Sequence, residues 1–276
     1  MHVAMTGSYK VIACDLDGTL LDGHHRVGSF SAAMVRAVVD RGVRFVIATG
    51  RHYREVTGVR AQLGVDGDLI ACNGARVHDA TGRVTYRQDL PAELVRELCH
   101  PALVRGTMLN VYTDDEWLVD HIVPRPQGAI DTGLAHRIVS PWITPEGVAK
   151  VFYIGELPAL HAIERDLQSQ FADRVSYAYS LADCLEVTAA NVDKGHALAA
   201  WLDGHGFTPA DCLAFGDGMN DLQMLRLAGK ALVMGNASPR VIAALPGLEA
   251  IGSHRDEAMA HYLQQLYQLT VKPSSR

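Results

Sequence analysis

Two hydrophobic patterns alternate along the first part of the chain. Short, mainly apolar runs at Val11–Cys14, 43–49 and 69–72 are typical of strands that are buried on both faces. Between them, apolar residues recur at helical spacing over 31–41 and 53–63, and each of these segments ends at a glycine. Strands that alternate with helices in this way predict a parallel α/β sheet with right-handed crossovers.

The middle of the chain follows a different pattern. Segments 75–78 and 83–86 flank the Asp-Ala-Thr-Gly turn at 79–82 and predict a β-hairpin. A proline-rich irregular stretch covers 123–145. The remaining elements that we predict here are helices at 91–105 and 157–171, and strands at 108–112, 117–119, 148–154, 175–179 and 184–188. Hairpins combined with two helices predict a separate α+β unit.

From Lys194 onward the alternation of helix and strand returns. The predicted elements are helices at 194–205, from 221, at 239–245 and at 256–269, and strands at 213–215 and 231–234. The fold class is therefore α/β, with a Rossmann-like parallel-sheet core built from 9–83 and 189–271. Residues 84–188 are expected to form an inserted α+β cap domain, and 1–8 and 272–276 disordered tails.

Composition and charge narrow the class of protein. The 276 residues, 48% hydrophobic and 20% charged, are enough for a sizeable core and are not of disordered type. A net charge of −6 argues against a nucleic-acid partner, and no apolar run approaches the length of a membrane span. The N-terminus lacks the pattern of a secretory signal, and the five scattered cysteines disfavour a disulfide framework or structural zinc. We expect a cytoplasmic protein with no nucleic-acid or membrane partner, and the oligomeric state stays open.

Acidic residues follow two of the predicted strands. The segment D-L-D-G-T at 15–19 comes directly after the first strand, at the sheet edge where α/β proteins bind ligands. Asp15 and Asp17 would repel each other unless a cation compensated them, and Mg²⁺ prefers such carboxylate oxygens. The segment G-D-G-M-N-D at 216–221 follows a later strand in the same way and adds the carboxylates of Asp217 and Asp221. The two segments together favour one shared metal site.

Two further segments offer groups that could hold an anion. Thr49, Gly50 and Arg51 end the second strand with a hydroxyl, a backbone N–H and a guanidinium, and Lys194 places an ammonium at the positive end of a helix. Taken singly, each feature has a simpler interpretation: a solvated acidic turn, a threonine at a strand end or a surface lysine. A calcium loop is excluded for the acidic segments, since its twelfth position would be arginine or alanine instead of glutamate.

In combination, the four segments resemble the motifs of the haloacid-dehalogenase-like (HAD) phosphatase superfamily. Residues 15–19 match its D-x-D-G-T signature, Thr49 and Lys194 stand at its second and third motifs, and 216–221 match G-D-x-x-N-D. Only 34 residues separate Asp15 from Thr49, whereas 145 separate Thr49 from Lys194. This spacing resembles the Cof-type subfamily, whose α+β cap of the C2B type lies between the second and third motifs. Segments 73–78 and 114–117 are further similar to a bacterial pyridoxal phosphate and sugar phosphate phosphatase.

The resemblance implies a Mg²⁺-dependent phosphatase of small phosphorylated metabolites. Asp15 would attack the phosphorus, and Asp17 would protonate the leaving group and then activate water. Mg²⁺ would be held by Asp15, the Asp17 carbonyl and Asp217, with Asp221 behind them. The resemblance also implies groups that bind the phosphoryl oxygens, namely Leu16, Thr49, Gly50, Lys194 and Asn220, and groups toward the rest of the substrate, namely Arg51, Asn73 and Gly74.

The substrate is left open among sugar phosphates, pyridoxal phosphate and similar phosphomonoesters. A phosphomutase or other phosphotransferase acting on sugar phosphates is one alternative, because it would use the same core chemistry. A non-catalytic module that binds a phosphorylated metabolite is another, although such a module would have little need for Asp17.

Overall fold

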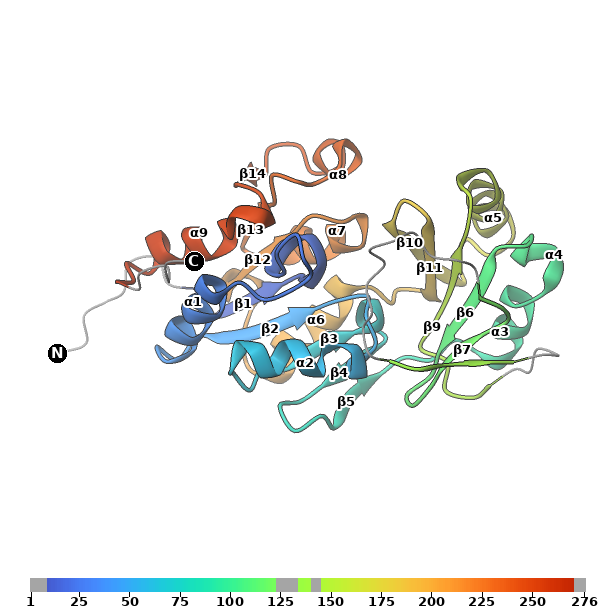
Figure 1. Cartoon of the computed structure of the whole chain (residues 1–276), viewed down its shortest axis with the longest axis horizontal. Helices are drawn as coiled ribbons and strands as arrows, with labels where there is room; N and C mark the ends of the chain where they lie inside the picture. Colours follow the sequence, from blue (N-terminus) through green and yellow to red (C-terminus); the bar gives the residue numbers. More distant parts are fainter. Residues whose placement is uncertain (1–8, 123–133, 140–144, 271–276) are drawn as a thin grey trace.

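The computed structural model describes residues 9–122, 134–139 and 145–270, which form two β-sheets that lie side by side with their helices (Figure 1). We call the eight-stranded sheet with its helices the core and the six-stranded sheet with its helices the cap. The tails expected to be disordered, 1–8 and 272–276, lie outside the described residues, and so does most of the proline-rich stretch at 123–145.

The core sheet has the strand order β14-β13-β12-β1-β2-β3-β4-β5. The six strands from β14 to β3 run parallel to their neighbours, and β4 and β5 continue the sheet as an antiparallel hairpin. The bounds of the core strands are β1 (Val11–Cys14), β2 (Arg44–Ala48), β3 (Leu69–Ala71), β4 (Arg76–His78), β5 (Val84–Arg87), β12 (Cys212–Gly216), β13 (Lys230–Val233) and β14 (Glu249–Ala250).

Helices cover both faces of the core sheet, because successive residues of its buried strands point to opposite sides. Ile12 and Cys14 of β1 pack with α1, α2 and α9, whereas Val11 and Ala13 pack with α6, α7 and α8. The bounds of these helices are α1 (Ser29–Val39), α2 (Tyr53–Leu63), α6 (Lys194–Gly204), α7 (Leu222–Leu227), α8 (Pro239–Ala244) and α9 (Ala258–Leu266). The loops that follow the parallel strands therefore lie at one edge of the sheet, at the carboxyl ends of the strands.

The cap sheet has the order β10-β11-β9-β6-β7-β8 and is antiparallel apart from the parallel pair β7 and β8. The cap helices pack on one face of this sheet, and Val151 and Tyr153 of β9 belong to the apolar cluster on that face. Phe152 points to the opposite face and belongs to the apolar cluster of the core. The bounds of the cap elements are α3 (Ala92–Leu98), α4 (Pro101–Val104), β6 (Met108–Tyr112), β7 (Trp117–Val119), β8 (His136–Ile138), β9 (Lys150–Ile154), α5 (Leu157–Gln170), β10 (Val175–Leu181) and β11 (Cys184–Ala189).

The predicted α/β fold class with a parallel sheet is confirmed, with local corrections. The helix predicted over 91–105 is wrong as one element, because Pro101 cannot continue a helix and instead begins the separate helix α4. Strands β8 and β14, of three and two residues, have no counterpart among the predicted elements. Strand β5 pairs within the core sheet, so the connection into the cap begins after residue 87, beyond the boundary predicted between 83 and 84. The division into two domains stays a prediction.

Candidate active site

The carboxyl ends of three adjacent core strands bring the acidic segments together. In the order β12-β1-β2, Asp217 follows β12, Asp15 follows β1 and Thr49 follows β2. The first turn of α6 adds Lys194 from a segment far along the chain. The structure therefore places these four predicted site residues at one edge of the sheet, as parallel strands with neighbouring ends require.

Lys194 is the buried cation of this site. Its Nζ donates hydrogen bonds to Asp15 Oδ1 at 2.5 Å and to Asp221 Oδ1 at 2.6 Å, and the side chain is fully buried. Burial alone would lower the pKa of Lys194, but the charges of Asp15 and Asp221 outweigh it and raise that pKa. The lysine is therefore a fixed positive charge between two carboxylates. Asp193 caps the helix by accepting from the N–H groups of Gly195 and His196.

The carboxylates of Asp15, Asp217 and Asp221 form a compact cluster, with one oxygen from each lying within 4.8 Å of the others. Burial first and the charge of Asp221 second raise the pKa of Asp15, and the same two causes raise the pKa of Asp217 to about 7. Three acidic groups thus share a site that contains a single lysine ammonium. A divalent cation would relieve this repulsion, and a set of hard oxygen donors suits Mg²⁺.

Asp221 already has hydrogen-bond donors on both of its oxygens. Besides the contact of Oδ1 with Lys194, Oδ2 accepts the backbone N–H groups of Asp217 at 3.0 Å and Gly218 at 2.8 Å. Asp217 in turn accepts from Thr19 Oγ1 at 3.3 Å and from Asn236 Nδ2 at 3.0 Å. The contacts of Asp221 fit a residue that orients the lysine and the loop, and the role of Asp217 as a cation ligand stays a prediction.

The side chain of Asp17 lies outside the carboxylate cluster and contacts Arg51. The guanidinium donates two hydrogen bonds, from Nε to Oδ2 at 2.7 Å and from Nη2 to Oδ1 at 2.5 Å, and His25 Nδ1 lies 3.5 Å from Oδ1. Burial opposes ionisation of Asp17, but the contacts with His25 and Arg51 outweigh it and lower the pKa. Gly18, with φ +82°, permits this turn, since a Cβ there would collide with the Asp217 carboxylate.

A second group of predicted residues lies beside Thr49. Asn220 Nδ2 donates to Asn73 Oδ1 at 3.1 Å, and the backbone N–H of Asn73 donates to the Thr49 carbonyl at 3.0 Å. Leu16 is fully buried in the turn after Asp15. Gly74 packs so closely on the Asp193 carbonyl that a side chain would not fit. The structure thus brings the predicted anion-binding loops into direct contact.

The cap contributes two charged residues that the sequence motifs do not reveal. Lys150 Nζ donates to the Gly50 carbonyl at 2.6 Å and to Glu186 Oε1 at 2.7 Å, and Glu186 Oε2 accepts from Asn73 Nδ2. Both side chains are buried. The available signal was a charged residue in each of two mainly apolar segments, where burial of a charge is costly unless it is paired.

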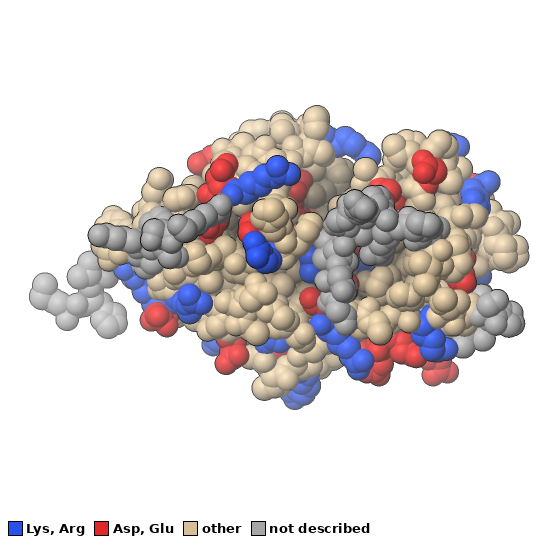
Figure 2. Space-filling model, in the orientation of Figure 1, with Lys and Arg blue, Asp and Glu red and all other residues tan. Residues whose placement is uncertain are grey.

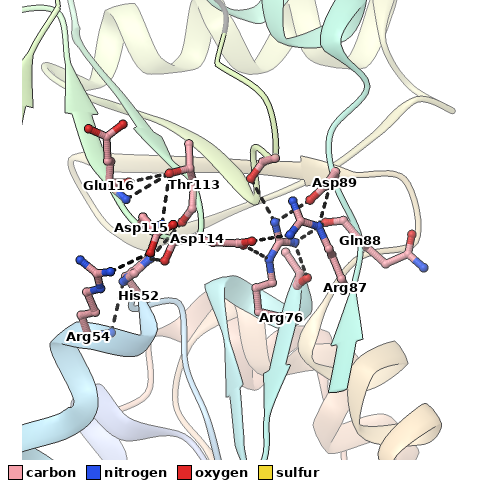
Figure 3. A network of polar contacts seen from close by, with 12 residues as sticks. His52, Arg54, Arg76, Arg87, Gln88, Asp89, Thr113, Asp114, Asp115 and Glu116 are labelled. Carbon is pink, nitrogen blue, oxygen red and sulfur yellow. Dashed lines mark hydrogen bonds and ion pairs between the residues drawn. The ribbon is translucent and has the colours of Figure 1, made fainter. Parts of the chain in front are cut away.

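A polar network also joins the core and the cap at the entry to the cap (Figure 3). Arg76 of β4 lies at its centre, donating from Nε to Asp114 Oδ1 at 2.6 Å and from Nη2 to Asp89 Oδ1 at 2.5 Å. Its remaining N–H groups reach the backbone carbonyls of Ala75, Gln88 and Gly147. Because Asp114 and Gly147 belong to cap loops, Arg76 holds both sides of this junction.

Comparison with known proteins agrees with the geometry of the site. A family model described as haloacid dehalogenase-like hydrolase matches residues 12–263. The chain is 37% identical over 259 residues to an HMP-PP phosphatase of Serratia proteamaculans, covering 93% of this chain and 94% of that protein. It is 37% identical over 257 residues to an HMP-PP phosphatase of Yersinia pseudotuberculosis, covering 92% and 94%. The chain therefore belongs to the haloacid dehalogenase-like hydrolase family.

A solved structure supports the same assignment. The crystal structure of a haloacid dehalogenase-like hydrolase from Bacteroides thetaiotaomicron is similar with a TM-score of 0.82 and 25% identity, covering 94% of this chain and 100% of that one. Within the family the chain is a Cof-type phosphatase, which confirms the enzyme class predicted from the motifs. The Serratia and Yersinia relatives are named for HMP-PP instead of pyridoxal phosphate or a sugar phosphate.

The distribution of charge on the surface and the character of the helices relate to the prediction that no nucleic acid or membrane is a partner. On the face shown in Figure 2, basic and acidic side chains of the described residues are interspersed, without a continuous basic surface. Among the helices in the described ranges, none combines the length and the apolar character that crossing a membrane requires. The cytoplasmic location stays a prediction.

Proposed function

We propose that this phosphatase hydrolyses small phosphomonoesters with the help of Mg²⁺, through a phosphate ester formed on Asp15. The observation that carries the proposal is the carboxylate cluster of Asp15, Asp217 and Asp221 around the buried Lys194 at the carboxyl edge of the core sheet. This arrangement provides a nucleophile, a fixed positive charge and a place for a cation within one small volume.

In the first step an oxygen of Asp15 attacks the phosphorus and the bond from phosphorus to the leaving oxygen breaks. Asp17 would give its proton to that oxygen, so it must be protonated at this step, although the contacts with His25 and Arg51 lower its pKa in the structure. Water then attacks the phosphorus of the aspartyl-phosphate, the bond from phosphorus to the Asp15 oxygen breaks, and inorganic phosphate leaves. Asp17 takes a proton from that water, so Asp15 is again a carboxylate and Asp17 again a carboxylic acid. Arg51 holds the Asp17 carboxylate in a fixed orientation through two hydrogen bonds.

The transferring phosphoryl group carries negative charge that the site must balance. Lys194 provides a cation from the core, and Thr49 and Asn220 supply a hydroxyl and an amide beside it, with backbone N–H groups at Leu16 and Gly50. Bound Mg²⁺ would supply Lewis-acid stabilisation of the phosphoryl oxygens and offset their repulsion from the nucleophile. Asp15, Asp217 and the Asp17 carbonyl would hold it, while Asp221 orients the loop.

The substrate that we propose is a small phosphorylated metabolite. The two relatives described above are named for HMP-PP, which makes HMP-PP the first compound to assay. Pyridoxal phosphate and sugar phosphates complete the panel. Release of inorganic phosphate to water distinguishes hydrolysis from transfer to a second sugar, because a phosphomutase would instead return a phosphorylated sugar.

The decisive test is Asp15→Asn, because a neutral amide cannot form the phosphate ester. We expect phosphate release to vanish while circular dichroism remains that of the parent. Asp173→Asn, at an exposed position of the cap, is the matched control and should retain full activity. A folded Asp15→Asn protein that kept about a tenth of the parent rate would refute the assignment of the nucleophile.

The metal is tested separately by chelation and replacement. Activity should disappear after exhaustive chelation and return with Mg²⁺. Ca²⁺ should inhibit, since its longer bonds and larger coordination number would displace Asp15 from the line of attack. Turnover that survived chelation, or full turnover with Ca²⁺, would contradict the proposed metal site.

A further inference from the structure

The cap contributes a buried ion pair to the phosphoryl-binding loops of the core. Lys150 lies on β9 and Glu186 on β11, and their side chains are 2% and 7% exposed. Since Glu186 pairs with Phe152 across the two strands, it shares with Lys150 the sheet face that is turned away from the cap helices. We call Lys150 and Glu186 the cap ion pair.

Lys150 reaches the core through one peptide group. Its Nζ donates to the Gly50 carbonyl, and the N–H of the same peptide, that of Arg51, donates to Thr49 Oγ1 at 3.1 Å. A cation on the carbonyl polarises the peptide and strengthens the hydrogen bond at its other end. Because the Thr49 oxygen accepts this hydrogen bond, its O–H remains available to donate to a phosphoryl oxygen.

Glu186 reaches the core through two amides. A carboxylate can only accept, so the Asn73 amide must turn its NH₂ group toward Glu186 and its oxygen toward Asn220. That oxygen accepts one N–H of Asn220 and leaves the other for a phosphoryl oxygen. The orientation of two amides therefore follows from one cap carboxylate.

The backbone around Asn73 indicates that this contact is costly to make. Cys72, Asn73 and Gly74 all have positive φ, at 50°, 54° and 98°. Asparagine tolerates a positive φ, but Cys72 does not do so readily, and strain of this kind persists where the surroundings enforce it, often at functional sites. A buried ion pair also carries a desolvation cost that apolar side chains of similar size would avoid. Both costs are understandable if the contacts position the phosphoryl-binding groups.

We propose that Lys150 and Glu186 are positioning residues that complete the phosphoryl-binding site from the cap. Lys150 acts through the Gly50–Arg51 peptide on Thr49, and Glu186 acts through Asn73 on Asn220. This inference rests on the proposed function, because it takes Thr49 and Asn220 to bind the phosphoryl group. It makes the affinity for inorganic phosphate depend on the cap, although neither residue touches the phosphate.

The test measures inorganic phosphate as a competitive inhibitor, since it occupies the phosphoryl site and has no leaving group to contact the cap. Lys150→Met and Glu186→Gln are compared with the parent in the presence of Mg²⁺. Each variant should bind phosphate about tenfold more weakly, the effect of losing about one charge-assisted hydrogen bond. Because both act on one network, the double variant should lose less than the product of the two single losses.

Glu97→Gln is the matched control, because the Glu97–Arg174 pair is also in the cap but is exposed and remote from the loops. It should bind phosphate like the parent. Glu186→Gln preserves side-chain volume. If Lys150→Met does not fold, the phosphate affinity of Glu186→Gln alone therefore tests the proposal. A lowered melting temperature with unchanged phosphate affinity would overturn the proposal and leave the pair a structural role. A parent that released no phosphate from any substrate would instead refute the proposed function.

Discussion

The two sheets of this enzyme place their polar chemistry in different ways. In the core, both faces of the sheet are covered by helices, and the reactive groups stand in the loops where β1, β2 and β12 end. In the cap, helices cover one face only, and the strands themselves carry Lys150 and Glu186 on the other. The polar groups of the core thus lie along the edge of its sheet, and those of the cap lie on one face of its sheet.

This difference separates the tasks of the two parts. Loops at a sheet edge fix both backbone and side-chain groups around one point, which suits bond making and breaking. A sheet face carries side chains at alternate positions of each strand. The side chains of the cap face can contact the site at the core edge only where the two sheets meet. We therefore expect substitutions at the core edge to affect the chemical step most, and substitutions across the junction to affect its assembly.

After the loss of activity expected for Asp15→Asn, the largest effect should follow from Asp17→Asn at the core edge. A sugar alkoxide departs slowly unless it is protonated, so loss of a general acid should slow its release by about 10²–10⁴-fold. A nitrophenolate needs little protonation and should be affected much less. Single-turnover measurement of the phosphorylation step on both substrates isolates this role from the later activation of water. Equal slowing for both substrates would show that Asp17 is not the acid.

Lys194→Met should have the next largest effect. It removes the positive charge between Asp15 and Asp221, and the loss of one preorganised stabilising group typically costs about 10²–10³-fold in rate. Phosphate release should be measured beside urea unfolding, because the uncompensated carboxylates should also destabilise the fold. Lys230→Met, which breaks an exposed pair with Glu249, is the control and should alter unfolding by less than about 1 kcal/mol.

Arg76→Met tests the junction between the core and the cap. All five N–H groups of this buried guanidinium have partners, so we expect a loss of about 2–3 kcal/mol in the free energy of unfolding. Arg87, which contacts Asp89 and Asp114 from a more exposed position, offers the control Arg87→Met with a smaller loss. Urea unfolding checks both variants. Equal losses would mean that burial of Arg76 adds nothing to the junction.

The most gradual effect concerns pH and the cation. The raised pKa of Asp217, about 7, means that the metal-free fold favours the protonated carboxyl, and this contribution to stability is lost as the pH rises toward that value. Mg²⁺ would replace the proton. Its stabilising effect should therefore grow from about pH 5 to pH 7, by at most about 1.4 kcal/mol per pH unit, and level off above. Melting temperatures with and without Mg²⁺ test this, and Asp217→Asn should reduce the pH dependence to the part that comes from Asp15, whose pKa is also raised.

The same contrast explains how much could be predicted from the sequence. Each core motif is contiguous, as in 15–19 and 216–221, and follows a recognisable apolar strand, so its place at the sheet edge follows from the fold. Lys150 and Glu186 are single residues on separate strands, and only strand pairing reveals that they share a face. The contact of Arg51 with Asp17 also depends on a loop conformation that no short pattern specifies.

All five cysteines are buried thiols, and their positions allow them to report on motion. Cys14 and Cys212 lie on the adjacent strands β1 and β12 in the middle of the core sheet, so a thiol reagent should reach them only when the core unfolds. Cys72 lies in the loop bearing Asn73, and Cys184 lies on β11 near Glu186. Separation of the sheets would uncover these two first. The order in which the thiols react would therefore show whether the cap separates from the core before the core unfolds.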